Sequence, residues 1–309
     1  MIYCTLLNPA LDLVYSTEKF SAGGTLRDIP LRVVPSGKGM NVACIVRTLG
    51  EESAVVGIMP EESRNRFTSW LDKKKVQHRF MAVQGEARMN VTILESEGAQ
   101  SSHINSRGSP IGREAGEEFL QFAGSHLAAG DEWCFSGSIA PRLGEDLYAR
   151  IIAQCKSAGV DTFLDTRGKA LSLGIAAGPL VLKPNSTEFE DIFGEQIQGV
   201  HHLALKGKKL LDRGISHVFI TLGSDGMIAL HDSDCLLSVP PQVKSIDTVG
   251  CGDALMAGIL VAWKRRFSFS ETCRLAVACG AAKAMHAGPD ALTRDEVWQL
   301  MEDVKITAV

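Results

Sequence analysis

Short apolar segments with the pattern of buried β-strands alternate along this chain with segments that have the pattern of α-helices. The strand-like runs are VVGI (55–58), EWCFSGS (132–138), TFLDT (162–166), PLVLKPN (179–185) and HVFITLG (217–223). The helix-like stretches that separate or follow them cover 145–159, 202–214, 253–266, 270–286 and 293–304. Regular alternation of this kind predicts βαβ units around a mostly parallel sheet, and therefore an α/β fold.

Two segments, 12–35 and 86–106, interrupt the alternation. Both have β-like patterns without an intervening helix, and the second predicts a hairpin that turns at Glu97-Gly98. Extra β-structure on a parallel sheet often forms a lid that excludes water from a reaction. The sequence has no internal repeat and no low-complexity linker, so we expect one domain over 1–309 with these two segments as its lid.

Charge and composition exclude several classes of protein. The 32 basic and 36 acidic residues give a net charge of −4, which leaves no electrostatic footprint for nucleic acid or an anionic membrane. The apolar start of the chain is short and has no basic residue before Lys19, which argues against a signal peptide. The eight cysteines are scattered without a C-x-x-C pair, which predicts buried reduced thiols and a cytoplasmic protein.

Several familiar phosphate-binding signatures are absent. Every Gly-Lys pair is followed by Gly, Ala or Lys, so the chain has no Walker A loop. The GKGMN and GCGDAL stretches both lack the third glycine of a dinucleotide fingerprint, and the protein-kinase motifs are missing. Any phosphate site in this chain must be of another kind.

The stretch DTVGCGDALMAGIL (247–260) predicts such a site. SIDTV is typical of a strand end, GCG of a tight turn and ALMAGILVAW of a buried helix. Backbone N–H groups at a helix start attract anions, and glycines let an anion approach them closely. Asp253 follows this turn, either as an ordinary helix N-cap or as a carboxylate that accepts a proton during phosphoryl transfer.

This stretch resembles the C-terminal signature D-T-x-G-A-G-D of the PfkB (ribokinase-like) carbohydrate kinases, with Cys251 in place of alanine. The resemblance implies a ribokinase-like three-layer α/β/α sandwich with a mostly parallel central sheet and a small β-sheet lid. It also implies that Asp253 is the catalytic base, that Gly250, Cys251 and Gly252 supply anion-hole amides, and that ATP and Mg²⁺ are used.

PSGKGMNVACIVRTLG (35–50) is similar to the N-terminal family signature G-G-K-G-x-N-x-A, with Ser36 in place of the first glycine. Apolar residues at 42, 45, 46 and 49 independently predict a helix that starts near Asn41. The resemblance makes Gly37, Lys38 and Asn41 substrate-binding residues. A glycine-rich turn with a solvated lysine is the structural alternative.

Two further segments resemble the nucleotide-binding elements of the family, TLGSDGMIAL (221–230) and KPNSTEFEDIFG (183–194). A plain β-turn would explain the first, and a capping box of Asn185 with Glu188 would explain the second. The resemblance places Glu188 near Mg²⁺ through water. It implies that the ATP-binding residues are Lys183, Asn185, Thr221, Gly223, Gly226 and Ser245.

NPALD (8–12), RMNV (88–91) and SGSIAP (136–141) are most similar to the family branch that phosphorylates ketohexose phosphates. A phosphorylated substrate needs cations, and arginine binds phosphate through two parallel hydrogen bonds. The resemblance implies that Asp12 accepts hydrogen bonds from sugar hydroxyls, with a turn-forming role as the alternative. Arg27 and Arg88 lie in the two lid segments and Lys38 on the signature loop, so we expect them to bind the phosphate, unless the arginines are only solvated, with Ser138 as a hydroxyl donor. Thr92 replaces an expected lysine, and Ala140 and Arg142 alter the third motif, so the position of the substrate phosphate, C1 or C6, stays open.

These motifs lead to the expectation of an ATP-dependent kinase that converts a ketohexose monophosphate to the bisphosphate. The alternatives are a kinase of an unphosphorylated sugar or nucleoside, and a non-catalytic sugar-phosphate sensor. The resemblance also suggests a monovalent cation, K⁺, at the Asp247–Val249 loop together with segment 283–288. Because a lid sheet has exposed edges, we expect a homodimer that pairs through the lid, with no nucleic acid or membrane partner.

Overall fold

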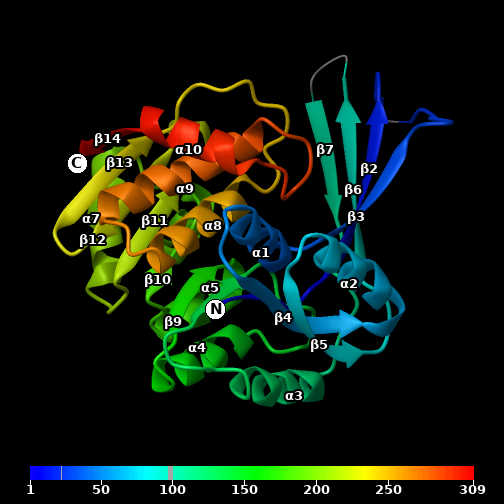
Figure 1. Cartoon of the computed structure of the whole chain (residues 1–309), viewed down its shortest axis with the longest axis horizontal. Coiled ribbons are helices and arrows are strands. Elements are labelled where there is room, and N and C mark those ends of the chain that lie inside the picture. Colours follow the sequence, from blue (N-terminus) through cyan, green and yellow to red (C-terminus); the bar gives the residue numbers. More distant parts are fainter. Residues whose placement is uncertain (22, 97–99) are drawn as a thin grey trace.

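The computed structural model describes residues 1–21, 23–96 and 100–309. Within these residues the chain forms a large sheet covered by helices on both faces, with a small second sheet projecting from one side (Figure 1). The predicted turn at Glu97-Gly98 lies outside the described residues.

The large sheet has ten strands in the described part of the chain. Its pairs are parallel from β11 to β5 across the sheet order, and the edge β11-β12-β13-β14 is antiparallel. This agrees with the predicted mostly parallel sheet. In spatial order the strands are β14 (Lys305–Ala308), β13 (Asp234–Val239), β12 (Met227–His231), β11 (His217–Thr221), β10 (Val181–Leu182), β9 (Asp161–Asp165), β8 (Glu132–Ser136), β1 (Ile2–Leu6), β4 (Ser53–Pro60) and β5 (Gln77–Val83).

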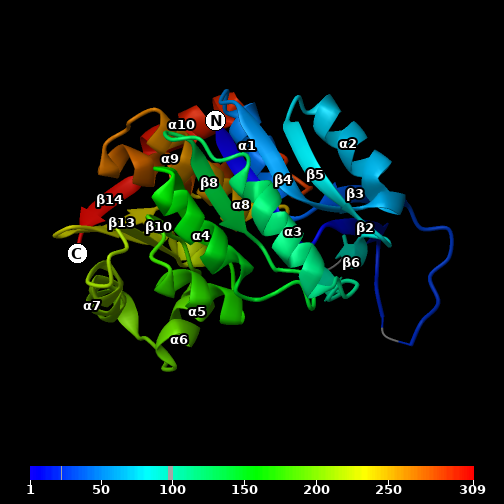
Figure 2. The ribbon, with the colours of Figure 1, turned by 90° about the horizontal axis from the view of Figure 1, so that it is seen from below.

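Helices cover both faces of this sheet, which makes the three layers that the resemblance implies (Figure 2). One layer contains α1 (Lys38–Thr48), α2 (Arg64–Lys73), α8 (Cys251–Lys264), α9 (Phe269–Ala284) and α10 (Arg294–Asp303). The other contains α3 (Arg113–Gly124), α4 (Leu147–Ser157), α5 (Gly168–Ala176), α6 (Ser186–Phe193) and α7 (Gly199–Leu211).

Each layer has its own apolar core against the sheet. Side chains that alternate along a strand point to opposite faces, so neighbours such as Cys4 and Tyr3 of β1 belong to different cores. Helix α8 is almost completely buried, which explains why its sequence, ALMAGILVAW, is apolar on every side rather than on one stripe.

The small sheet contains β3 (Leu31–Ser36), β2 (Ala10–Thr17), β6 (Arg88–Glu95) and β7 (Gln100–Asn105), in that spatial order. Strands β2 and β6 pair in parallel, whereas the two outer pairs are antiparallel, so the sheet is mixed. These strands come from the two segments that interrupt the alternation of strand and helix in the sequence. In Figure 1 they project away from the helical layers.

Three local expectations need correction. The strand predicted over 179–185 is only two residues long, because Lys183 and Pro184 leave the sheet to reach the start of α6. Residues 245–249 are not a strand but an irregular loop that leads into α8. Helix α1 begins at Lys38, three residues before the expected start, since Gly39 packs against the backbone of β1 and continues the helix.

Candidate active site

A polar cavity of about 330 Å³ opens where strands β1, β8 and β9 end. Cations, amides and hydroxyls dominate its lining, which suits a small anionic and hydroxylated ligand. The lining residues are Leu6, Leu7, Asn8, Lys38, Arg88, Asn90, Asn105, Ser136, Gly137, Ser138, Thr166, Arg167, Asn185 and Glu188. We call this the polar cavity.

A second cavity of about 580 Å³ lies beside the first turn of α8 and the turn that follows β11. It has glycines, prolines and small side chains where the first has charges, so its surface is largely backbone and apolar. The lining residues are Thr221, Gly223, Ser224, Gly226, Pro240, Pro241, Gln242, Val243, Ser245, Thr248, Cys251, Gly252, Leu255, Val277, Gly280, Ala281 and Ala284. We call this the small-residue cavity.

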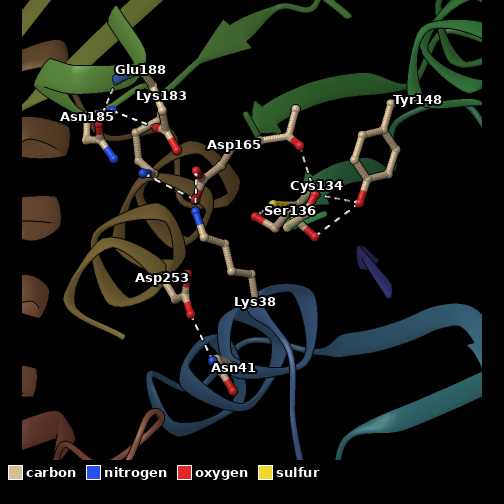
Figure 3. A network of polar contacts seen from close by, with 12 residues as sticks. Lys38, Asn41, Cys134, Ser136, Tyr148, Asp165, Lys183, Asn185, Glu188 and Asp253 are labelled. Atoms are coloured by element: carbon tan, nitrogen blue, oxygen red, sulfur yellow. Dashed lines mark hydrogen bonds and ion pairs between the residues drawn. The ribbon is translucent and has the colours of Figure 1, made fainter. Parts of the chain in front are cut away.

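Asp253 is buried in the first turn of α8, directly after a residue that lines the small-residue cavity. Its Oδ2 accepts a hydrogen bond of 2.8 Å from Nδ2 of Asn41, on α1 (Figure 3). The expectation that Asp253 caps α8 is wrong, because Gly250 is the N-cap and no side chain caps this helix. The carboxylate is therefore not used for helix capping.

Gly250 cannot be replaced by another residue without distortion. Its φ is 87°, in the left-handed region, and a Cβ there would lie 2.2 Å from the carbonyl oxygen of Pro289. This tight turn starts α8 directly before Asp253. The N–H of Cys251 donates to the backbone oxygen of Thr248 at 3.2 Å, so the N–H groups of Gly250 and Gly252 are the better candidates for an anion hole.

The pKa of Asp253 is raised from 3.8 to about 6, mainly because the carboxylate is buried, and the nearby carboxylate of Asp165 acts in the same direction. The ammonium of Lys38 and the hydrogen bond from Asn41 act in the opposite direction without cancelling the shift. A carboxylate with this pKa is ionised near neutral pH yet basic enough to accept a proton in a reaction.

A buried network beside Asp253 joins α1, strand β9 and the segment between β10 and α6. Asp165, at the carboxyl end of β9, forms ion pairs with Nζ of Lys38 at 3.0 Å and with Nζ of Lys183 at 3.2 Å (Figure 3). Burial alone would raise the pKa of Asp165, but the two ammonium groups outweigh it and hold the pKa below its ordinary value. Two positive charges are thereby fixed around one negative charge at the base of the polar cavity.

Arg88 connects the small sheet to the polar cavity. Its Nε donates to the carbonyl oxygen of Asn8 at 3.3 Å, and one terminal nitrogen donates to that of Ser106 at 2.9 Å. Burial lowers the pKa of Arg88, with the nearby Arg167 adding to the effect and Asp12 opposing it. Arg88 and Arg167 thus place two guanidinium groups on one cavity.

Asp12 and Ser138 each bond to an amide side chain that lines the polar cavity. Nδ2 of Asn90 donates to Oδ1 of Asp12 at 2.8 Å, and Nδ2 of Asn8 donates to Oγ of Ser138 at 3.0 Å. Ser138 lines the cavity itself, whereas Asp12 orients Asn90, which does.

Asn185 and Glu188 form the capping box of α6, as the sequence alternative predicted. The Asn185 side chain accepts from the backbone N–H of Glu188 at 2.8 Å, and Glu188 Oε2 accepts from that of Asn185 at 2.9 Å. Both residues also line the polar cavity. Mg²⁺ in kinases is bound through one or two carboxylates, waters and substrate phosphates, so Glu188 suits that chemistry. The described residues hold no cluster of three or more metal-ligating side chains.

Asp247 lies on the loop before α8, with Lys283 against it. The Lys283 ammonium donates to the backbone oxygen of Asp247 at 2.9 Å and lies 3.7 Å from its Oδ2. The place expected for K⁺ therefore contains the side chain of a lysine.

The structure groups the expected site residues into two sets. The polar cavity takes Lys38, Arg88, Ser138, Asn185 and Glu188, and the small-residue cavity takes Thr221, Gly223, Gly226, Ser245, Cys251 and Gly252. Asn41 and Lys183 contact Asp253 and Asp165 instead, and Gly37 precedes α1. Arg27 is exposed and lies outside the lining of both cavities in the described part of the chain.

Sequence reasoning missed Asp165, which pairs with Lys38, and three residues that line the polar cavity, Arg167, Asn8 and Asn90. A signal existed for Asp165, because TFLDT puts a carboxylate at the carboxyl end of a buried parallel strand, where ligand sites form. Asn8 and Asn90 lie inside NPALD and RMNV, yet neither motif indicates which of its residues reaches the cavity.

Comparisons with known proteins match nearly the whole chain to one family. The family model described as pfkB family carbohydrate kinase matches residues 6–295. A protein named 1-phosphofructokinase from Bacillus subtilis is 30% identical over 307 residues, which is 99% of each chain. One of the same name from Haemophilus influenzae is 28% identical over 304 residues, 98% of this chain and 97% of that protein.

Among solved structures, phosphofructokinase-2 from Escherichia coli in complex with potassium superposes with a TM-score of 0.92 at 22% identity, over 98% of each chain. At this identity the match shows the fold alone. No helix in the described residues is both long and apolar enough to cross a membrane.

Proposed function

The chain belongs to the pfkB family of carbohydrate kinases, and on that basis we propose that it transfers the γ-phosphoryl group of ATP to a fructose monophosphate, giving the bisphosphate. The 1-phosphofructokinase named above supports this choice of substrate, because its match extends over 99% of both chains. The ketohexose-phosphate motifs NPALD and RMNV lie at the polar cavity, which agrees with it.

One observation carries the proposal: Asp253 is a buried carboxylate of raised pKa that directly follows Gly252 of the small-residue cavity and is acted on by the ammonium of Lys38, which lines the polar cavity. In our account the sugar phosphate occupies the polar cavity and ATP the small-residue cavity. Phosphoryl transfer requires mainly that the two substrates are aligned and that charge is stabilised, and this arrangement provides for both.

In the proposed reaction Asp253 accepts the proton of the attacking sugar hydroxyl. Asn41 holds the carboxylate in place through its hydrogen bond of 2.8 Å, and the pKa of about 6 keeps Asp253 ionised at neutral pH. The oxygen that loses its proton attacks the γ-phosphorus, and ADP leaves on the opposite side. The backbone N–H groups at Gly250 and Gly252 stabilise the charge on the transferring group, whereas that of Cys251 first has to leave the backbone oxygen of Thr248.

The lysines of the buried network add fixed positive charge to this region. A Cβ built on Gly252 would lie 3.7 Å from Nζ of Lys183, so that ammonium is adjacent to the proposed anion hole. Lys38 lines the polar cavity and shares Asp165 with Lys183. When bound, Mg²⁺ would neutralise charge on the ATP phosphates. Glu188 and Asn185 would hold it through water molecules.

The substrate phosphate is assigned to the guanidinium groups at the mouth of the polar cavity. Arg88 and Arg167 both line it, whereas Arg27 is exposed on the loop between β2 and β3. Our proposal gives Arg88 the main contact and leaves Arg27 a role only if the lid segments 12–35 and 86–106 close over the sugar. Thr92 offers no cation, and Arg167 supplies one from another element.

The small sheet also supports the proposed homodimer. One of its faces is apolar, and the exposed fractions of Ile104, Met89 and Leu31 are 64%, 50% and 47%. These residues lie on β7, β6 and β3, so the face extends across the sheet, and a second copy would cover it. Light scattering should give twice the chain mass of 33.3 kDa, and Ile104→Glu should shift it toward the monomer.

The proposed cytoplasmic location agrees with the eight cysteines, which are all unpaired in the structure. Seven of the eight are buried, so they pack as small apolar side chains.

A coupled ADP-release assay with Mg-ATP tests the function. The panel contains fructose 1-phosphate, fructose 6-phosphate, tagatose 6-phosphate, fructose and ribose. We expect turnover of one fructose phosphate, and which of the two is used shows whether the substrate phosphate is on C1 or C6. Turnover of fructose or ribose alone would instead establish a kinase of unphosphorylated sugars. ATP binding without turnover of any substrate would favour a sensor.

A further inference from the structure

Lys283 lies in the last turn of α9, and its side chain is completely buried. Its Nζ donates to the backbone oxygens of Asp247 at 2.9 Å and of His286 at 3.0 Å, and lies 3.7 Å from Oδ2 of Asp247. An unpaired buried ammonium would be very costly, so these three oxygens are what allows the charge to be there.

Two of these oxygens belong to Asp247, which lies on the loop that leads into α8. Oδ1 of Asp247 accepts from the N–H of Val249 at 2.9 Å, and Oδ2 accepts from that of Gly288 at 3.1 Å. The backbone oxygen of Ala284 accepts from the N–H groups of Ile246 and Asp247. The ammonium thus joins the end of α9 to the loop whose next residues are the glycines of the proposed anion hole.

This arrangement does not fit a bound K⁺ ion, which the sequence led us to expect here. A monovalent cation in a protein is held by carbonyl and carboxylate oxygens. Here the Lys283 ammonium, which has the same charge, donates hydrogen bonds to the backbone oxygens of Asp247 and His286 and forms an ion pair with Oδ2 of Asp247. The C-terminal end of α9 adds the negative end of a helix dipole, which favours the cation further.

We propose that the Lys283 ammonium takes the place of a bound monovalent cation, so that this kinase works without K⁺. The inference rests on the proposed function only for its effect on turnover. Lys283 is a positioning residue: it contacts neither cavity, but it fixes the Asp247–Val249 loop and hence the N–H groups of Gly250, Cys251 and Gly252. Because the charge is covalently attached, the loop is held whatever the ionic composition of the medium.

The first test compares the wild-type protein in K⁺ with the same protein in tetramethylammonium at equal ionic strength. We expect the same kcat, the same ADP affinity and the same thermal midpoint in both salts. A wild-type protein that requires K⁺ for activity, or that K⁺ stabilises specifically, would overturn the inference without any mutation.

The second test uses a matched pair of variants. Lys283→Ala removes the charge and leaves room for an ion, whereas Lys283→Met removes the charge and fills the room. Without K⁺ we expect both variants to lose about 10- to 100-fold in kcat, the range found when a supporting contact behind a site is lost. K⁺ or ammonium should restore Lys283→Ala and leave Lys283→Met inactive. Lys264→Ala, at the far end of α8, serves as the control for losing a partly buried lysine.

Thermal midpoints and ADP titrations of the same variants need no sugar, so they separate this inference from the proposed substrate. A K⁺-dependent rise in the midpoint of Lys283→Ala, absent from Lys283→Met and from the wild-type protein, supports the cation role even if every sugar fails. If Lys283→Ala folds only in K⁺, the same conclusion follows from refolding yields. A folded Lys283→Ala that ignores K⁺ in all readouts would show that Lys283 has a packing role alone.

Discussion

The polar cavity and the small-residue cavity are built by opposite means. The polar cavity takes its properties from long side chains, such as Lys38 and Arg88, that reach it from separate elements. The small-residue cavity takes them from backbone and from residues too small to obstruct it, mostly within 221–226 and 240–252. Charge should therefore control binding in the first cavity, and shape should control it in the second.

The contrast between the two cavities also explains the pKa of Asp253. The cations of the polar cavity lower its pKa, while its burial beside the small-residue cavity raises it, and burial is the larger effect. The following predictions would break or sharpen this contrast.

The largest effect should come from Asp253, which follows Gly252 of the small-residue cavity and is close enough to Lys38 of the polar cavity for that ammonium to lower its pKa. Asp253→Asn keeps the hydrogen-bonding shape but cannot accept the proton, so we expect kcat to fall about 10²- to 10⁴-fold. ATP and sugar phosphate should still bind, as measured by calorimetry. Asp234→Asn, an exposed aspartate on β13, is the control. A variant that retains more than about a tenth of wild-type kcat would exclude Asp253 as the base.

Shape control predicts a difference between two glycines. Gly250→Ala would bring a Cβ to 2.2 Å from Pro289, whereas Gly223→Ala meets nothing within 4 Å, although φ is positive at both positions. Gly223→Ala should cost only the left-handed strain of about 1–2 kcal/mol in the free energy of unfolding. Gly250→Ala should cost more and also reduce kcat by about 10²-fold, because the anion-hole amides move. Denaturant unfolding and kcat for both variants check this, and equal losses would contradict it.

The same contrast decides how much could be predicted from the sequence. The small-residue cavity is encoded locally: TLGSDG and DTVGCGD each bring their glycines together within a few residues, so motif reading finds them. The polar cavity depends on tertiary contacts such as Lys38 with Asp165, which are 127 residues apart. TFLDT places Asp165 at the end of a strand, but no local pattern specifies that Lys38 is its partner, and Arg167 has no local signal.

The fold shows a similar division. Short apolar runs identified β8, β9 and β11, and helix-like patterns identified the C-terminal helices, because their apolar residues face a core directly. Loop 245–249 was misread as a strand because its apolar residues are exposed rather than part of the sheet, as Ile246 at 62% exposure shows. The role of Lys283 was hidden for the same reason as that of Asp165, since a buried lysine has no signature in one sequence.

Charge control predicts that Arg88→Ala weakens binding of the phosphorylated sugar without changing the chemistry. Loss of a charge-assisted hydrogen bond costs about 1.5–3 kcal/mol, so KM for the fructose phosphate should rise about 10- to 100-fold. Slow turnover of unphosphorylated fructose, where measurable, should be unaffected. Arg113→Ala, an exposed arginine on α3, is the control. Equal losses for both sugars would mean that Arg88 has only a structural role.

The smallest effect concerns pH. Because Asp253 must be deprotonated to act, kcat should fall as the pH drops through about 6, tenfold per pH unit below it. Asn41 donates to the carboxylate and so lowers the pKa of Asp253; Asn41→Ala should move this acid limb up by about one pH unit. The exposed Asn65→Ala should leave the limb in place. A limb that does not move, or that moves to lower pH, would contradict the assignment.

The most direct test of the two-cavity account is a crystal structure with a non-hydrolysable ATP analogue and the fructose phosphate that the assay selects. The account predicts the nucleotide in the small-residue cavity, the sugar phosphate beside Arg88, and the reacting hydroxyl within about 3 Å of Asp253. Both ligands in one cavity, or a sugar with no hydroxyl near Asp253, would contradict it.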